Sequence, residues 1–398
     1  MQRIKLEVPS VLSREEILQK LALFFDTVVL TGRKVLIICE DVTRSTPIDL
    51  FFPDFLQYLQ RRAAAVTVLF ALGTHRPMTH LEMVQKLGLT DEQARELPLL
   101  NHNAFDEAAL VDVGAVESVP LKVNRALAEH EVIVALGSVL PHRVMGFSGG
   151  AKYLCPGVAN KAMIDYTHWK SNLFPEEQVM GNIDNPIRLI LDAIADQIAD
   201  RLPGDYVSIN CVTAPDGIVD LFVGSFYQSY RQAAALTAQV LFKTVPECSR
   251  LLAILDDKCT DFWQGAKAVY NCGAVIRDGG TIVIQGALPE GISASHGPVI
   301  EKFGYSTPEQ IFALVEAGEF TDQVVVASHM VRVSQRLQRL NIFLASENID
   351  PATCERVNLG YRDPRSIDEA EFDYVVYNPA DLILVKPEDQ TGTSRAVA

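Results

Sequence analysis

Residues 34–59 read KVLIICEDVTRSTPIDLFFPDFLQYL, and this stretch decides the fold. Its first part, Lys34 to Cys39, is an apolar run of strand length that is followed by two acidic residues. A polar loop comes next, and residues 48–59 then place apolar side chains at helical spacing. The stretch therefore predicts a strand, a loop and a helix, which is the repeating unit of α/β proteins.

The same unit recurs along the chain. A second apolar run at residues 65–72 leads through a polar loop to a helix near 79–87, and a third run occupies 131–137. Strands that alternate with helices in this way form largely parallel sheets. We further expect helices at 188–201, 227–243 and 261–268, a hairpin of strands at 206–212 and 218–224, and strands at 251–257, 275–285, 323–327, 341–344, 372–377 and 381–385.

The length of 398 residues predicts two domains, each large enough to bury its own core. We expect an N-terminal α/β cofactor-binding domain at residues 1–243, completed by residues 372–398, and a C-terminal α/β domain at 247–371. The predicted linker is residues 244–247. The predicted fold class is therefore two α/β domains with largely parallel sheets and an active-site cleft between them, with the C-terminal domain closing over the substrate.

Composition excludes several classes of function. A net charge of −15 without any long basic run argues against nucleic acid and anionic membranes as partners. No uninterrupted apolar segment reaches the length of a membrane span, and the first residues lack the apolar region of a signal peptide, so we expect a cytoplasmic protein. The seven cysteines are scattered without a C-x-x-C pair, which argues against disulfides and a thiolate zinc site.

Polar clusters follow three of the predicted strands. They are Asp41 to Arg44, Gly73 to Arg76, and the loop from His142 to Lys152. The carboxyl ends of parallel strands share one edge of the sheet, where α/β proteins bind their ligands. The three clusters are therefore expected to converge on one site.

The span of residues 136–170 holds most of the predicted chemistry. Imidazoles such as those of His142 and His168 can ligate a metal or move protons, and a partly desolvated Lys152 can act as a nucleophile. The turn through Ser148, Gly149 and Gly150 is expected to point backbone N–H groups at an anion. Each residue taken singly also fits an ordinary structural role, as a core histidine, a solvated lysine or a tight turn.

Taken together, the motifs resemble the nickel-dependent lactate racemase family. They occur in the family's order over roughly residues 40–290. The matching segments are Asp41-Val42-Thr43-Arg44-Ser45-Thr46-Pro47, Gly73-Thr74-His75-Arg76, Pro141-His142, Gly146-Phe147-Ser148-Gly149-Gly150-Ala151-Lys152, Pro156-Gly157, His168 and Trp263-Gln264-x-x-Lys267.

The resemblance implies a racemase or epimerase that inverts the α-carbon of a 2-hydroxy acid by proton-coupled hydride transfer. It also implies a nickel pincer nucleotide, which is a nickel-bearing pyridinium-3,5-bisthiocarboxylic acid mononucleotide made and delivered by other proteins. The implied roles are covalent attachment by Lys152, nickel ligation by His168, acid–base catalysis by His75 and His142, cofactor contacts from Asp41, Arg44, Ser148, Gly149 and Gly150, and substrate contacts from Arg44, Trp263, Gln264 and Lys267.

Two positions depart from the family pattern. Ala151 stands where many members have arginine, and Trp263 stands where tyrosine is common. Both favour a bulkier or polyhydroxy 2-hydroxy acid, such as an aldonate, over lactate. Two other functions stay open: a metal-dependent lyase or hydrolase that uses His75, His142 and His168 as ligands, and a carrier or sensor of the cofactor or of a hydroxy acid.

Overall fold

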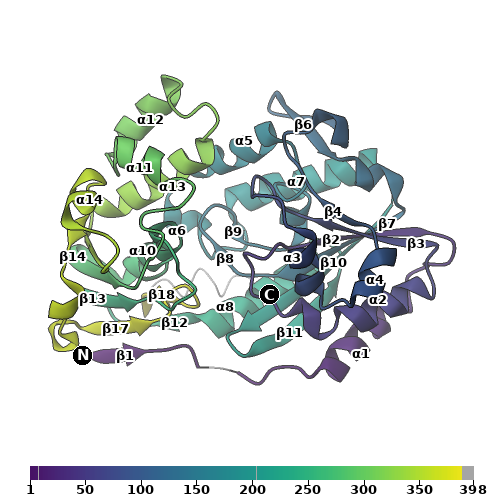
Figure 1. Cartoon of the computed structure of the whole chain (residues 1–398), viewed down its shortest axis with the longest axis horizontal. Coiled ribbons are helices and arrows are strands. Elements are labelled where there is room, and N and C mark those ends of the chain that lie inside the picture. The colour runs from purple at the N-terminus through teal and green to yellow at the C-terminus, as the bar shows by residue number, and fades with distance from the viewer. Residues whose placement is uncertain (8, 203, 388–398) are drawn as a thin grey trace. The chain divides into compact units, whose positions relative to one another are not determined.

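A computed structural model describes residues 1–7, 9–202 and 204–387 (Figure 1). The chain folds into two compact units. The N-terminal unit is Val8–Val240, and the C-terminal unit combines Met1–Glu7 with the chain from Leu241 onward. Each unit contains a six-stranded, largely parallel sheet, so the predicted fold class of two α/β domains with largely parallel sheets is confirmed. Among the described residues, no helix is both long and apolar enough to cross a membrane.

The N-terminal unit begins at α1 and ends in α8. Its elements in chain order are α1 (Arg14–Phe25), β2 (Lys34–Cys39), η1 (Ile48–Leu50), α2 (Phe52–Gln60), β3 (Ala65–Phe70), α3 (His80–Leu87), α4 (Asp91–Glu96), β4 (Leu99–Asn101), η2 (Glu107–Ala109), β5 (Leu110–Val116), β6 (Val119–Asn124), η3 (Arg125–Glu129), β7 (Val132–Ser138), β8 (Pro141–His142), β9 (Gly146–Phe147), η4 (Gly150–Tyr153), α5 (Lys161–Ser171), α6 (Glu176–Val179), α7 (Pro186–Arg201), β10 (Asp205–Ala214), β11 (Gly217–Gly224) and α8 (Gln228–Leu241).

The large sheet of this unit has the strand order β11-β10-β7-β2-β3-β4. Strands β10, β7, β2, β3 and β4 pair in parallel, and β11 pairs antiparallel with β10 as the predicted hairpin. The three strands that precede the predicted polar clusters, β7, β2 and β3, are therefore immediate neighbours. Their carboxyl ends lie side by side at one edge of the sheet.

Both faces of this sheet are buried, which explains why β2 reads as a continuous apolar run. Val35 and Ile37 belong to one hydrophobic core, which includes side chains of α1, α2 and α3. Leu36 and Ile38 alternate to the other face and belong to a second core, which includes side chains of α5 and α7. The strand is therefore rigid up to its last residue, which fixes the starting point of the loop that follows it.

The C-terminal unit has a sheet of strand order β1-β17-β13-β14-β15-β16, in which all the pairings are parallel. A two-stranded sheet of β12 and β18 belongs to the same unit. Its elements are β1 (Gln2–Ile4), β12 (Phe242–Thr244), β13 (Cys248–Ile254), α9 (Phe262–Gly265), α10 (Lys267–Cys272), η5 (Gly273–Val275), β14 (Ile276–Gln285), α11 (Gly297–Phe303), α12 (Pro308–Glu316), α13 (Val324–Leu337), β15 (Asn341–Ala345), α14 (Pro351–Arg356), β16 (Gly360–Tyr361), η6 (Pro364–Ser366), η7 (Glu369–Glu371), β17 (Tyr374–Tyr377) and β18 (Ile383–Val385).

Two predictions about this half of the chain are wrong. Residues 372–387 do not complete the N-terminal unit, because β17 pairs between β1 and β13 and β18 pairs with β12. Residues 388–398 lie outside the described residues. The predicted strand at 323–327 is instead the start of α13, whose side chains from Val326 to Ser334 are all buried. A helix buried on nearly all sides shows a continuous apolar run, which short-range patterning does not distinguish from a strand.

Candidate active site

The loop after β2 begins with a buried carboxylate. Asp41 is 5% exposed, and its Oδ2 lies 2.6 Å from Nδ1 of His75, which follows β3. Its Oδ1 accepts hydrogen bonds from the backbone N–H and the hydroxyl of Thr43. Burial by itself would raise the pKa of Asp41, but the bond to His75 and the bond to Thr43 outweigh it and hold this pKa well below its ordinary value.

The contact with Asp41 fixes the tautomer of His75. An ionised carboxylate can only accept, so Nδ1 of His75 donates and carries the proton. The lone pair of the neutral ring is then on Nε2. The side chain of His75 is 52% exposed, so the ring can meet a ligand while its Nδ1 stays bonded to Asp41.

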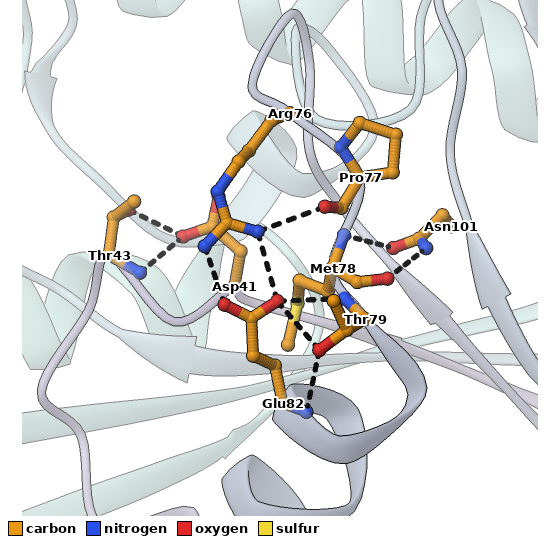
Figure 2. Close-up of polar contacts among 8 residues, drawn as sticks. All are labelled: Asp41, Thr43, Arg76, Pro77, Met78, Thr79, Glu82 and Asn101. Atoms are coloured by element: carbon orange, nitrogen blue, oxygen red, sulfur yellow. Dashed lines mark hydrogen bonds and ion pairs between the residues drawn. The ribbon is translucent and has the colours of Figure 1, made fainter. Parts of the chain in front are cut away.

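The loop that carries His75 is fixed at its far end by α3, as Figure 2 shows. Glu82 accepts from the backbone N–H of Thr79 at 2.7 Å and from Nη1 of Arg76 at 2.9 Å. The Arg76 guanidinium and the Thr79 N–H lower the pKa of Glu82 to about 2, so the carboxylate stays charged at neutral pH. Asn101 bonds both the N–H and the carbonyl of Met78. Glu82 and Asn101, together with Arg76, therefore hold this loop in place.

His142 has the opposite hydrogen-bond setting. It lies in the short hairpin of β8 and β9, and the backbone N–H of Val144 donates to its Nδ1 at 3.2 Å. The neutral ring therefore carries its proton on Nε2. Burial of the ring, together with the charges of Lys152, Arg44 and other neighbours, places the pKa of His142 well below its ordinary value. This imidazole is neutral across the physiological range.

His168 lies on α5, and its Nδ1 donates to the carbonyl of Ile164 at 2.8 Å. A carbonyl cannot donate, so the lone pair of this ring is on Nε2. Burial is the main cause that lowers the pKa of His168 to about 3, partly opposed by the bond to Ile164. A neutral imidazole whose Nδ1–H is fixed by a backbone carbonyl has the arrangement typical of a metal ligand.

Lys152 lies in the 3-10 turn η4, next to this group of side chains. Among the described residues, none forms a hydrogen bond with its ammonium group. Burial and the nearby charge of Arg44 lower the pKa of Lys152 to about 7, and the carboxylates of Asp41 and Glu40 oppose that shift. Its amine is therefore about half neutral at pH 7, as a nucleophilic lysine requires.

The glycine turn before Lys152 is required by close packing. Gly149 and Gly150 have φ angles of 87° and 54°. A Cβ on Gly150 would lie 2.5 Å from Nη2 of Arg188 and 2.9 Å from the carbonyl oxygen of Phe226. Any larger residue would therefore combine an unfavourable backbone conformation with a clash.

This turn differs from the anion cradle that the sequence predicts. The N–H of Gly150 donates to Oδ1 of Asn210 at 3.0 Å. The N–H of Ser148 donates to the carbonyl of Leu140, and its hydroxyl bonds the backbone of Ser138 and Leu140. The N–H groups of Ser148 and Gly150 are thus occupied inside the fold, and both residues shape the loop that presents Lys152.

The N-terminal unit therefore brings six of the predicted residues together. The charge of Lys152 lowers the pKa of both His142 and His168. The charge of Arg44 lowers the pKa of His142 and of Lys152, and the charge of His75 lowers that of His168. Among the described residues, no group of three or more His, Cys, Asp or Glu side chains is arranged to hold a metal ion.

The sequence analysis missed three charged residues of this cluster. Arg143 and Arg188 add positive charge near His142 and Lys152, and Glu40 adds negative charge. The position of Arg143 directly after His142 was a usable signal. Arg188 lies on α7, and only the fold brings it to this loop.

Trp263, Gln264 and Lys267 lie in the C-terminal unit, on α9 and α10. Asp261 caps α9 by accepting from the N–H of Gln264 at 2.9 Å. The Trp263 ring stacks on the buried His329 ring with centroids 4.1 Å apart, and it lies 4.4 Å from the His296 ring. The indole is therefore held by two imidazoles that lie outside the motifs.

His102, Cys155 and Cys272 lie outside the motifs and are buried. His102 is buried, and its ring bonds the carbonyl of Ala159 and the side chain of Asn124. Cys155 and Cys272 are buried free thiols, and burial raises both of their pKa values. They pack as small apolar side chains.

Known proteins are similar to this chain in sequence and in fold. Residues 15–181 match the family described as the lactate racemase N-terminal domain. The lactate racemase of Lactiplantibacillus plantarum is 23% identical over 354 residues, which cover 84% of this chain and 78% of that protein. The lactate racemase of Thermoanaerobacterium thermosaccharolyticum is 25% identical over 271 residues, which cover 65% of this chain and 61% of that protein.

Two solved structures have the same fold. A protein from Thermotoga maritima matches with a TM-score of 0.82 and 24% identity, covering 96% of this chain and 100% of that one. The lactate racemase apoprotein from Thermoanaerobacterium thermosaccharolyticum matches with a TM-score of 0.80 and 19% identity, covering 96% and 95%.

Proposed function

Because the chain belongs to the lactate racemase family, we propose that it is an isomerase that inverts the α-carbon of a 2-hydroxy acid. One observation carries the proposal beyond family membership. The three clustered imidazoles hold Nδ1 in three different ways: His75 donates to a carboxylate, His142 accepts from an N–H, and His168 donates to a carbonyl. Three such settings suit three different tasks.

We propose that the cofactor is the nickel pincer nucleotide, and two residues fit it. Lys152, with a pKa of about 7, has the neutral amine that a covalent attachment requires. His168 offers a neutral imidazole with its lone pair on Nε2, and nickel binds nitrogen together with sulfur donors. When bound, the cofactor supplies an acceptor for the hydride of the α-carbon.

The protein side chains would bind the substrate and move its protons. Arg44 would hold the carboxylate, and Nε2 of His75 would take the hydroxyl proton of one enantiomer while Asp41 stabilises the imidazolium. His142 would serve the opposite face. In its neutral form, this ring carries its proton on Nε2 and can donate it from there. Nε2 can act as a base only in the other tautomer, with the proton on Nδ1, and that tautomer cannot accept the hydrogen bond from Val144.

We also propose substrate contacts from Gln264, Lys267 and Trp263. Lys267 would add a second positive charge for the carboxylate, and Gln264 would bond a hydroxyl group. Trp263, stacked on His329, offers a rigid indole surface to the substituent of the α-carbon. This surface favours a 2-hydroxy acid larger than lactate, such as an aldonate.

A racemisation assay tests the proposal. Protein loaded with cofactor is incubated with single enantiomers of a panel of 2-hydroxy acids and aldonates, and chiral chromatography follows the product. We expect optical purity to fall without net oxidation or reduction. His75→Ala and His142→Ala should each slow the reaction about 100-fold or more, whereas the exposed His80→Ala should not.

Mass spectrometry tests the cofactor independently. We expect loaded protein to carry an adduct on the peptide that contains Lys152, and Lys152→Ala to lack it. Racemisation that survives both His75→Ala and His142→Ala at the full rate would contradict the assigned chemistry.

A further inference from the structure

Glu40, at the edge of the cluster described above, forms a buried ion pair with Lys86, and no step of the proposed reaction uses this pair. Glu40 directly follows β2, and Lys86 lies on α3. Their side chains are 5% and 7% exposed, and Nζ of Lys86 is 3.0 Å from Oε1 of Glu40. Removing two charges from water is unfavourable, so a pair at this depth needs compensating contacts.

Lys86 spends its other donors on the loop that carries Asp41 and Arg44. Its Nζ donates to the carbonyl of Arg44 at 2.8 Å and to the carbonyl of Thr46 at 3.1 Å. With the bond to Glu40, all three ammonium hydrogens have acceptors. The backbone of Arg44 is therefore fixed by a side chain from another element.

Glu40 makes the corresponding contacts toward the other loops. Its Oε2 accepts from the N–H of Ser138 at 2.8 Å and from the Ser138 hydroxyl at 3.0 Å, at the end of β7. The hydroxyl of Tyr153, next to Lys152, lies 3.5 Å from the same oxygen. A Cβ on Gly137 would lie 2.0 Å from that hydroxyl, so a glycine is needed there for the contact.

We propose that Glu40 and Lys86 are positioning residues that hold three active-site loops in register. The loop of Asp41 and Arg44 is held through Lys86, and the loops after β7 and around Lys152 are held through Glu40. This inference rests on the proposed function only in one respect, which is the identity of the reaction that the positioned groups catalyse. The positioning itself is a property of the protein without cofactor.

Replacing the pair one residue at a time separates positioning from simple stability. Lys86→Met or Glu40→Gln alone leaves the partner buried without its counter-charge, so each should lower Tm. The double variant Glu40→Gln with Lys86→Met removes both charges and should recover most of that loss. It still lacks the ammonium donors to the carbonyls of Arg44 and Thr46.

Hydrogen exchange of the cofactor-free protein, read peptide by peptide, is the decisive measurement. The N–H groups of Thr43 and Arg44 both bond Asp41, so they report on the loop directly. We expect exchange there to rise about tenfold or more in Lys86→Met and to stay fast in the double variant. Lys122→Met, which breaks an exposed pair with Glu107, is the matched control and should leave this loop unchanged.

The catalytic readout uses loaded enzyme. We expect kcat/KM to fall by about 10- to 100-fold in Lys86→Met and to remain low in the double variant although its Tm recovers. The proposal would be overturned if the double variant regained both kcat/KM and slow hydrogen exchange in the loop of Thr43 and Arg44. It would also be overturned if hydrogen exchange in Lys86→Met rose equally in all peptides. If no 2-hydroxy acid is racemised, the proposed function fails, while the exchange result in cofactor-free protein still decides the positioning.

Discussion

The most direct quantitative prediction concerns Lys152. Its pKa of about 7 compares with 10.5 for an ordinary lysine, so its neutral fraction at pH 7 is about half instead of roughly 3 in 10,000. That difference is about 1,600-fold at neutral pH. Lys152 should therefore react far faster than other lysines with an acylating reagent at pH 7, before any cofactor is attached.

Competitive labelling with isotopic acetic anhydride, read by mass spectrometry across pH 5 to 11, measures this directly. The rate at Lys152 should rise through a midpoint near pH 7 and then level off. Lys122 is an internal reference, because its bond to Glu107 raises its pKa and its rate should keep rising above pH 10. Arg44→Gln should shift the Lys152 midpoint upward, since the Arg44 charge is the largest electrostatic cause of the low value.

One result would refute this reasoning. A midpoint near 10 for Lys152 in the folded protein would mean that its amine is well solvated. Attachment of the cofactor would then need another source of activation, and the role of Arg44 as the neighbouring charge would fall with it.

Three further predictions concern single residues. Asp41→Asn should lower kcat of loaded enzyme by about 100- to 10,000-fold, because the amide cannot stabilise protonated His75 as a carboxylate does; chiral chromatography measures it. Gly150→Ala should destabilise the protein by about 1–3 kcal/mol in urea unfolding, more than Gly279→Ala, which has φ of 74° but no atom within 4 Å of the added Cβ. Folding lowers the pKa of His168 to about 3, so between pH 3 and 6.5 the unfolded chain binds more protons than the folded chain. The free energy of unfolding should therefore fall as pH falls. From pH 6.5 to 5, this residue should account for a loss of about 2 kcal/mol.

Each of these predictions has a clear contrary result. Full activity of Asp41→Asn would show that the carboxylate only folds the loop. Equal stability of the two alanine variants would show that the turn has room near Arg188. For His168, the comparison is with His168→Gln, which should lose less stability between pH 6.5 and 5 than the unmodified protein, and an equal loss would contradict the assignment.

The sequence by itself determined the α/β class and most elements of the N-terminal unit. The reason is visible in β2, where each residue from Val35 to Cys39 is buried and the loop residues after it are polar. An apolar run of this length that a polar loop and a helical pattern follow predicts the strand of an α/β unit. Parallel strands place their carboxyl ends together, so the convergence of Asp41 with His75 followed from order along the chain.

The sequence did not determine how the apolar runs of the second half would fold. Residues 323–327 look like a strand, yet they begin α13. Residues 372–377 do contain a strand, but it joins the C-terminal sheet between β1 and β13 and not the N-terminal unit. Pairing partners lie hundreds of residues apart in the chain, and no local pattern specifies them. Burial on all sides likewise hides the helical period of α13.

Only the tertiary structure decided the electrostatics of the site. Residue type alone does not distinguish His75, His142 and His168, but their Nδ1 atoms meet a carboxylate, an N–H and a carbonyl, which assigns the proton of each neutral ring. The low pKa of Lys152 arises from burial and from Arg44, and the buried pair of Glu40 and Lys86 has no motif at all. These properties depend on distances between separate loops, which the order of residues does not contain.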